Sequence, residues 1–159
     1  MEDVREPGDE EFWNSFQKRM NYTDEQLASF RADPQKAKVP QVMGSPRIRR
    51  STLVLEVVES HGCAEGMEAG DKLYFTGLSK LDPQRSSPWC AYALPTVHMY
   101  VGVCQNLLGH GLDPNDMYWP YFGCIDCGFG LGWGQVKMKA YVIEDTPDNP
   151  SEQAERPVS

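Results

Sequence analysis

The chain has 159 residues, of which 40% are hydrophobic and 24% are charged. This length and composition predict one globular domain with a core of its own, and they exclude a chain that is disordered throughout. The formal net charge of −8 and the pI near 4.8 argue against nucleic acid or an anionic membrane as the main partner, because phosphate groups repel such a surface.

The cysteine content favours a cytoplasmic protein. The first residues, MEDVREPGDEEF, are acidic and contain no apolar run, so they do not resemble a signal or transit peptide. No apolar stretch reaches the roughly 20 residues that a spanning helix needs. Five cysteines without an export signal predict reduced thiols that serve metal binding or redox chemistry rather than disulfides.

The N-terminal part predicts a helical arm. We expect disorder over residues 1–8 and two short helices within 9–39. Phe12, Trp13 and Phe16 recur at helical spacing in the first helix, and Thr23 with Gln26 is typical of a capping box at the start of the second. The arm either packs on its own domain or binds a partner subunit. Residues 40–50 are basic and contain prolines, which predicts a linker.

Residues 51–145 predict an α+β domain, in which a small, mostly antiparallel sheet packs on one buried central helix. The β-branched run 51–59 indicates the first strand, 72–77 the second and 134–145 the last. A helix is expected from Pro88 towards Leu108, kinked or split at Pro95. In the last strand Val136, Met138, Ala140 and Val142 should face one way. The polar residues 146–159 predict a disordered tail.

Cys124 and Cys127 form a C-x-x-C pair, which is typical of metal binding or of thiol chemistry. The following FGLGWG cannot begin a stable helix, which disfavours a thioredoxin-type site. A closed zinc site needs two further ligands. The candidates are His61 and Cys63, in the loop after the first strand, and Cys90 at the expected helix N-terminus, where the pKa of a thiol is lowered.

Alternating glycines follow the pair, at Gly128, Gly130, Gly132 and Gly134. They would let backbone N–H groups turn towards the sulfurs, as in metal-binding knuckles. They would also leave one face of a following strand without side chains, or simply make a hairpin connection beside two incidental thiols. Cys104 lies in an apolar helical run, and we expect it to be an ordinary buried thiol.

Three cysteine motifs occur in order along the chain. They are C-x-x-G-x-x-x-G-D from Cys63 to Asp71, C-x-x-A-L from Cys90, and C-x-D from Cys124. This arrangement resembles a family of small, uncharacterised bacterial proteins over residues 51–144. In that family the last motif usually reads Cys-Pro-Asp, whereas Ile125 stands here. The resemblance implies that Cys63, Cys90 and Cys124 belong to one site, and it carries no established activity.

The leading hypothesis is a small cytoplasmic metal-binding protein that holds zinc or an Fe–S cluster and serves as a subunit or accessory of a larger enzyme. Its ligands would be Cys63, Cys124 and Cys127 with either Cys90 or His61, and its protein partner would bind the N-terminal arm. One alternative is an enzyme with Cys90 as its reactive thiol. Another is a metal-free module that binds a small molecule among aromatic side chains. The sequence assigns no catalytic residue and no substrate.

Overall fold

The structure, a computed structural model, describes residues 9–144. The predictions of disorder for residues 1–8 and 146–159 therefore lie outside the described residues. An antiparallel sheet of five strands forms the larger part, and helices precede it in the chain. The predicted α+β class is confirmed. No helix in the described range is both long and apolar enough to cross a membrane.

The helical arm begins with α1 (Asp9–Met20) and α2 (Asp24–Ala32). Thr23 caps α2: its side chain accepts the Gln26 N–H, while the Gln26 side chain accepts the Thr23 N–H, so the predicted capping box is confirmed. The large apolar side chains of the arm pack against one another in a cluster of their own, made by Phe12, Trp13, Phe16 and Leu27 with Tyr22, Phe30 and Val39 around them. The side chains that suggested a partner are thus used inside the arm, and binding of a partner stays a prediction.

The predicted linker is helical. After the 3₁₀ turn η1 (Lys36–Lys38), residues 39–50 form α3 (Val39–Met43) and α4 (Pro46–Arg50). Each of these helices has a proline in its first turn, where the missing N–H would have had no partner inside the helix. Proline therefore starts these helices instead of preventing them. Val42 of α3 packs so closely on Gly109 that a Cβ there would lie 2.7 Å from its Cγ2.

The sheet has the strand order β3-β2-β1-β5-β4. Its strands are β1 (Ser51–His61), β2 (Lys72–Thr76), β3 (Lys80–Leu81), β4 (Tyr121–Gly123) and β5 (Gln135–Glu144). The sequence predicts β1, β2 and β5 but misses β3 and β4, which have two and three residues and are too short to show alternation. Val136, Met138, Ala140 and Val142 are all buried, as predicted.

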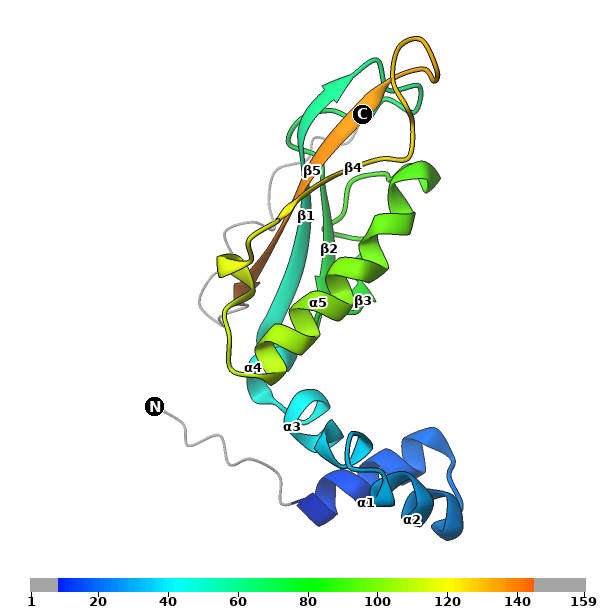
Figure 1. Cartoon of the computed structure of the whole chain (residues 1–159), viewed down its shortest axis with the longest axis vertical. Helices are drawn as coiled ribbons and strands as arrows, with labels where there is room; N and C mark the ends of the chain where they lie inside the picture. Colours follow the sequence, from blue (N-terminus) through cyan, green and yellow to red (C-terminus); the bar gives the residue numbers. More distant parts are fainter. Residues whose placement is uncertain (1–8, 145–159) are drawn as a thin grey trace.

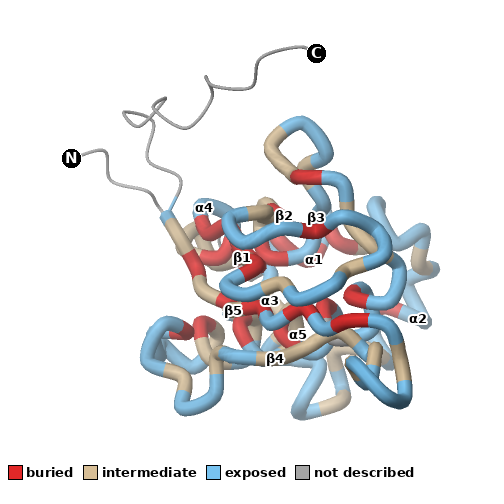
Figure 2. Tube along the Cα trace, turned by 90° about the horizontal axis from the view of Figure 1, so that it is seen from above, coloured by how far each residue is buried: buried red, intermediate tan, exposed pale blue. Residues whose placement is uncertain are grey.

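Helix α5 (Val97–Gly109) lies along one face of the sheet (Figure 1). Its buried residues Tyr100, Cys104 and Leu108 share one core with Leu53 and Leu55 of β1, and the buried stretches follow β1, β5 and α5 (Figure 2). The predicted burial of this helix holds on the side that faces the sheet, whereas Met99 and Val103 are 49% and 38% exposed. The helix also begins later than predicted: Ala91–Thr96, which contain Pro95, form the 3₁₀ helix η2.

The other face of the sheet is covered by its own large side chains. Val54 is fully buried there between its cross-strand neighbours Tyr74 and Tyr141. The Tyr141 hydroxyl donates to the Glu56 carboxylate at 3.0 Å, and the Arg85 guanidinium lies 4.4 Å from the centre of the Tyr74 ring. Cross-strand pairs of this kind stabilise a sheet face.

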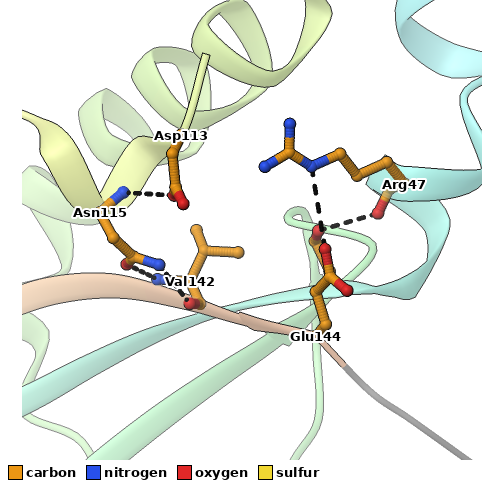
Figure 3. Close-up of polar contacts among 6 residues, drawn as sticks. Arg47, Asp113, Asn115, Val142 and Glu144 are labelled. Atoms are coloured by element: carbon orange, nitrogen blue, oxygen red, sulfur yellow. Dashed lines mark hydrogen bonds and ion pairs between the residues drawn. The ribbon is translucent and has the colours of Figure 1, made fainter. Parts of the chain in front are cut away.

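An asparagine side chain holds the end of β5 (Figure 3). Asn115, in the 3₁₀ turn η3 (Pro114–Asp116), donates its Nδ2 to the Val142 carbonyl and accepts the Val142 N–H, both at 2.9 Å. The Asp113 carboxylate accepts the Asn115 N–H at 2.9 Å and fixes the turn. The side chain of Asn115 thus pairs with β5 as a neighbouring strand would.

Candidate functional site

Three segments that are distant in the sequence meet at the end of the sheet farther from the arm (Figure 1). The pairing of β1 with β5 ends at His61 opposite Gln135, so Cys63, two residues later, lies beside the segment that leads into β5. The Cys124 N–H donates to the Val136 carbonyl at 3.0 Å. The Ile125 N–H donates to the Tyr92 carbonyl at 3.2 Å, which ties the C-x-x-C segment to η2.

These segments enclose a pocket of about 530 Å³. Four cysteines line it: Cys63, Cys90 and Cys124, one from each of the three motifs, and Cys127, the second member of the C-x-x-C pair. Met67 adds a thioether, and Tyr92 and Trp133 add aromatic rings. The structure thus brings these four side chains to one pocket, while their role as ligands of one site stays a prediction.

The four thiols are not equally placed. Cys63, Cys90 and Cys124 are half-buried and pack against a second core cluster made by Val57, Met67, Ala93, Val136 and Met138. Cys127 is exposed, and it is absent from that cluster. Three of the thiols are thus held by the core of the sheet, whereas the fourth is held by a loop.

Cys124 has a backbone partner for its sulfur. The Val136 N–H points at the Cys124 Sγ, with 3.4 Å between nitrogen and sulfur. Hydrogen bonds donated to sulfur tune the sulfur ligands of metal centres. The Cys127 thiol instead donates weakly to the Ile125 carbonyl, 3.9 Å away in its own loop.

The side chain of Asp126 organises the glycine-rich loop. Its carboxylate accepts the N–H groups of Gly128 at 3.0 Å, Trp133 at 2.9 Å and Gly134 at 3.3 Å. The bonds from Gly128 and Trp133 in particular hold the pKa of Asp126 below its ordinary value. A Cβ on Gly132 would collide with this carboxylate. The sequence predicts that backbone N–H groups of this loop turn towards the sulfurs. Those of Gly128, Trp133 and Gly134 instead point at the Asp126 carboxylate.

Two further constraints explain the other glycines. Gly128 and Gly130 have φ of +73° and +102°, which favours glycine. Gly134 touches the Gly62 backbone, and a Cβ there would collide with the Gly62 carbonyl. The segment is a tight loop rather than a strand with a bare face, and it presents Phe129, Leu131 and Trp133 to solvent, each at least 82% exposed.

His61 is not part of the pocket. It is the last residue of β1, it is exposed, and it does not belong to the lining. The prediction of His61 as a possible fourth ligand is therefore not supported by its placement, because the strand ends before the chain turns towards the pocket.

Cys90 lines the pocket, but it does not lie at the start of the α-helix that the sequence predicts. It precedes the six-residue 3₁₀ helix η2 and is separated from α5 by that helix, since Pro95 prevents one continuous α-helix. The predicted position of Cys90 at the N-terminus of an α-helix is therefore wrong. Cys104, by contrast, is fully buried in the main core, as predicted, and burial raises the pKa of its thiol to about 11.

The thiols of the pocket do not form a ready-made site for a single ion. Among residues 9–144, no three histidine, cysteine, aspartate or glutamate side chains are arranged to hold one metal ion. A structural zinc site requires four ligands at about 2.0–2.3 Å around one centre. The four thiols thus surround a shared space without converging on one point.

Sequence reasoning missed two contributors to this site. Met67, 4% exposed, belongs both to the lining and to the second core cluster, but a methionine in a polar loop gives no signal of its own. Asp126 enters the sequence prediction only as the last residue of the C-x-D motif, without a role of its own. The available signal was its spacing from four glycines, since an Asx side chain commonly accepts backbone N–H groups two residues ahead.

The chain matches no protein-family model, no curated protein and no solved structure. The resemblance to the bacterial cysteine-motif family therefore stays a prediction.

Proposed function

We propose that the protein binds an Fe–S cluster in the pocket lined by Cys63, Cys90, Cys124 and Cys127, and that it serves as a subunit or accessory of a larger enzyme. The observation that carries the proposal is the meeting of four cysteines from three distant segments around one space of about 530 Å³. Thiolates that belong to one centre must be brought together in this way, whereas incidental cysteines need not be.

A cluster accounts for the arrangement better than one zinc ion does. In a [4Fe–4S] cluster each of the four thiolates binds a separate iron, so the sulfurs can surround a space that is wider than a single ion. Zinc instead requires four donors around one centre, and the described residues offer no such group of even three. Zinc binding would need the thiols to reorient towards one another.

The surroundings of the thiols also suit a cluster. The N–H···S bond from Val136 to Cys124 is of the kind that stabilises charge on cluster sulfur. The apolar cluster around Met67 and Met138 would limit the access of water on the inner side, which influences the reduction potential. When bound, the cluster would supply electron transfer or Lewis acidity, and this chain would supply the four thiolates and their positions.

The accessory role rests on the outer side of the pocket. Ile125, Leu131 and Trp133 line the pocket and are 55%, 91% and 82% exposed. Apolar side chains gathered in this way are typical of contact surfaces. A partner at this face would lie next to the cluster, as electron transfer requires.

The test is metal analysis of protein purified without oxygen. We expect iron and acid-labile sulfide in comparable amounts and a broad visible absorption that bleaches on reduction. Cys124→Ala should abolish both signals, while Cys104→Ala, in the main core, should retain them as the matched control. Colourless protein that contains zinc and no iron would refute the cluster, and protein without either metal would refute metal binding altogether.

A second candidate is a metal-free site for a small molecule. It is favoured by the pocket volume, which falls within the range of about 300–1,000 Å³ typical of ligand sites, and by Tyr92 and Trp133 in the lining. Metal-free protein in which Trp133 fluorescence responds to a compound, with Trp133→Phe removing the response, would support this alternative.

A further inference from the structure

We infer that the outer side of the pocket is the docking surface for a basic segment of the partner protein, in which arginine side chains stand beside large apolar ones. This inference deepens the accessory role and rests on that part of the proposed function. It concerns the loops that surround the pocket, and it does not require a metal inside it.

The first ground is the apolar surface at the pocket. Ile125, Leu131 and Trp133 line the pocket and are 55%, 91% and 82% exposed. Tyr92, also in the lining, is 61% exposed. Single exposed apolar side chains are common on proteins, but a group of them around one cavity is typical of a contact surface. The partner should therefore bring apolar side chains that fill the cavity.

The second ground is the shape of the C-x-x-C loop, which the chain fixes by itself. The Asp126 carboxylate accepts the N–H groups of Gly128 at 3.0 Å and Trp133 at 2.9 Å. The Gly132 N–H donates to the Gly128 carbonyl at 2.7 Å. A backbone held in this way loses little conformational entropy when a partner binds. The exposed side chains of Leu131 and Trp133 are thus presented on a preorganised loop.

The third ground is charge. The two loops beside the pocket, residues 62–71 and 123–134, contain no lysine or arginine but four acidic residues, which are Glu65, Glu68, Asp71 and Asp126. Glu65 and Asp126 belong to the lining. Hydrogen bonds from backbone N–H groups hold the pKa of Asp126 below its ordinary value, so this carboxylate is ionised at neutral pH. A surface of one charge sign attracts the opposite sign and accelerates association with it.

Charge and aromatic rings together specify arginine. A guanidinium group pairs with a carboxylate such as that of Glu65, and it also stacks on an aromatic face such as that of Trp133. Lysine provides the charge but not the planar group. Arginine flanked by apolar residues therefore matches both features of this surface.

The same charges argue against other occupants. Nucleic acid and anionic membranes carry phosphate groups, which the carboxylates repel. A second copy of this chain that used the same face would bring Glu65 and Asp126 against identical carboxylates, because a twofold contact pairs a surface with itself. A basic segment of a different protein meets neither obstacle.

The experiment uses synthetic peptides as probes for the partner segment, and isothermal titration calorimetry measures their binding to the full chain. The probe is an acetylated and amidated peptide in which leucine alternates with arginine. One control peptide has glutamate in place of arginine, and another has serine in place of leucine. We expect only the leucine–arginine peptide to bind, with an affinity that falls several-fold as NaCl rises from about 50 to about 500 mM, because salt screens exposed charges.

Two substitutions test the surface itself. Glu65→Lys should weaken the binding of the leucine–arginine peptide roughly tenfold, and Leu131→Ser should weaken it as well. Both side chains are exposed, so neither change disturbs the core. The matched control is Glu25→Lys, which makes the same change of charge at an exposed position of α2 in the arm and should leave the affinity unchanged.

Three results would overturn the inference. They are the absence of binding by the leucine–arginine peptide, equal binding of the leucine–glutamate peptide, and equal effects of Glu65→Lys and Glu25→Lys. A dimer in light scattering that Leu131→Ser dissociates would also overturn it, because this result assigns the surface to a second copy. Iron analysis of the same protein tests the cluster separately: protein that lacks iron but binds the peptide would refute the cluster and retain this inference.

Discussion

Replacing Gly134 by alanine should distort the pocket, because it displaces the backbone beside Cys63. Gly134 is buried at the start of β5, and an added Cβ would collide with the Gly62 carbonyl. The obstacle is backbone rather than the end of a flexible side chain, so the turn that leads from β1 to Cys63 must move. Overpacking of this kind costs about 1–3 kcal/mol.

This cost can be converted into a melting temperature. For a domain of this size, each kcal/mol lowers the midpoint of thermal unfolding by about 2–4 °C, so the expected decrease is roughly 2–12 °C. The backbone that must move lies next to Cys63 and would shift this thiol relative to the C-x-x-C loop. Iron content should therefore fall together with stability. Circular dichroism on heating measures the first quantity, and iron analysis of anaerobically purified protein measures the second.

The matched control is Gly102→Ala. Gly102 lies within α5, and a Cβ there would have no atom within 4 Å. Alanine should therefore stabilise the helix by about 0.5–1 kcal/mol. A Gly134→Ala protein with an unchanged midpoint and full iron content would show that β1 and β5 do not approach each other as described.

Three further predictions concern other parts of the fold. Asn115→Ala removes two hydrogen bonds to Val142 and should cost about 1–3 kcal/mol in urea unfolding. Asn115→Asp keeps the acceptor but turns a carboxylate oxygen towards the Val142 carbonyl, so it should cost no less; unchanged stability in either variant would contradict the pairing. Asp126→Ala should accelerate chymotrypsin cleavage after Phe129, which is 98% exposed, because the loop loses the carboxylate that holds it; cleavage at the rate of the wild type would contradict this role. The free energy of unfolding should fall as the pH rises from 9 to about 11, by about 1.4 kcal/mol per pH unit from Cys104, because the folded protein keeps the proton of this thiol while the unfolded chain releases it. Cys104→Ala should show a smaller slope in pH-dependent denaturation, and an unchanged slope would refute the raised pKa.

The elements that the sequence predicts are those with strong local patterns. The β-branched run of β1 and the alternation of β5 determine which side chains are buried, because the side-chain period of a strand is two. The capping box at Thr23 is equally local, since its hydrogen bonds join residues three apart. For such elements, neighbours in the sequence already determine the structure.

Elements that depend on tertiary contacts were missed. β4 exists because β5 supplies its partners, with Phe122 opposite Met138, and its own three residues carry no strand pattern. Pro40 favours a linker where the structure has the helical turn α3, because Val42 packs against Gly109 at the end of α5. In both cases the decisive contact joins residues that are distant in the sequence, and a local sequence pattern cannot predict such a contact.

The pocket is the clearest case of this limit. The motifs identify which cysteines to consider, but the register of β1 on β5 decides where Cys63 lies. That register shifts between Val57 and Glu59, as in a β-bulge, which adds a residue to one strand and redirects those that follow. Without the shift, the side chains after Val57 would point to the opposite face, because a slip of one residue reverses a strand. Val58, the residue at the shift, is 42% exposed and has nothing in its sequence context to mark it. The position of Cys63 beside the other thiols of the pocket therefore follows a register shift that is visible only once the two strands are paired.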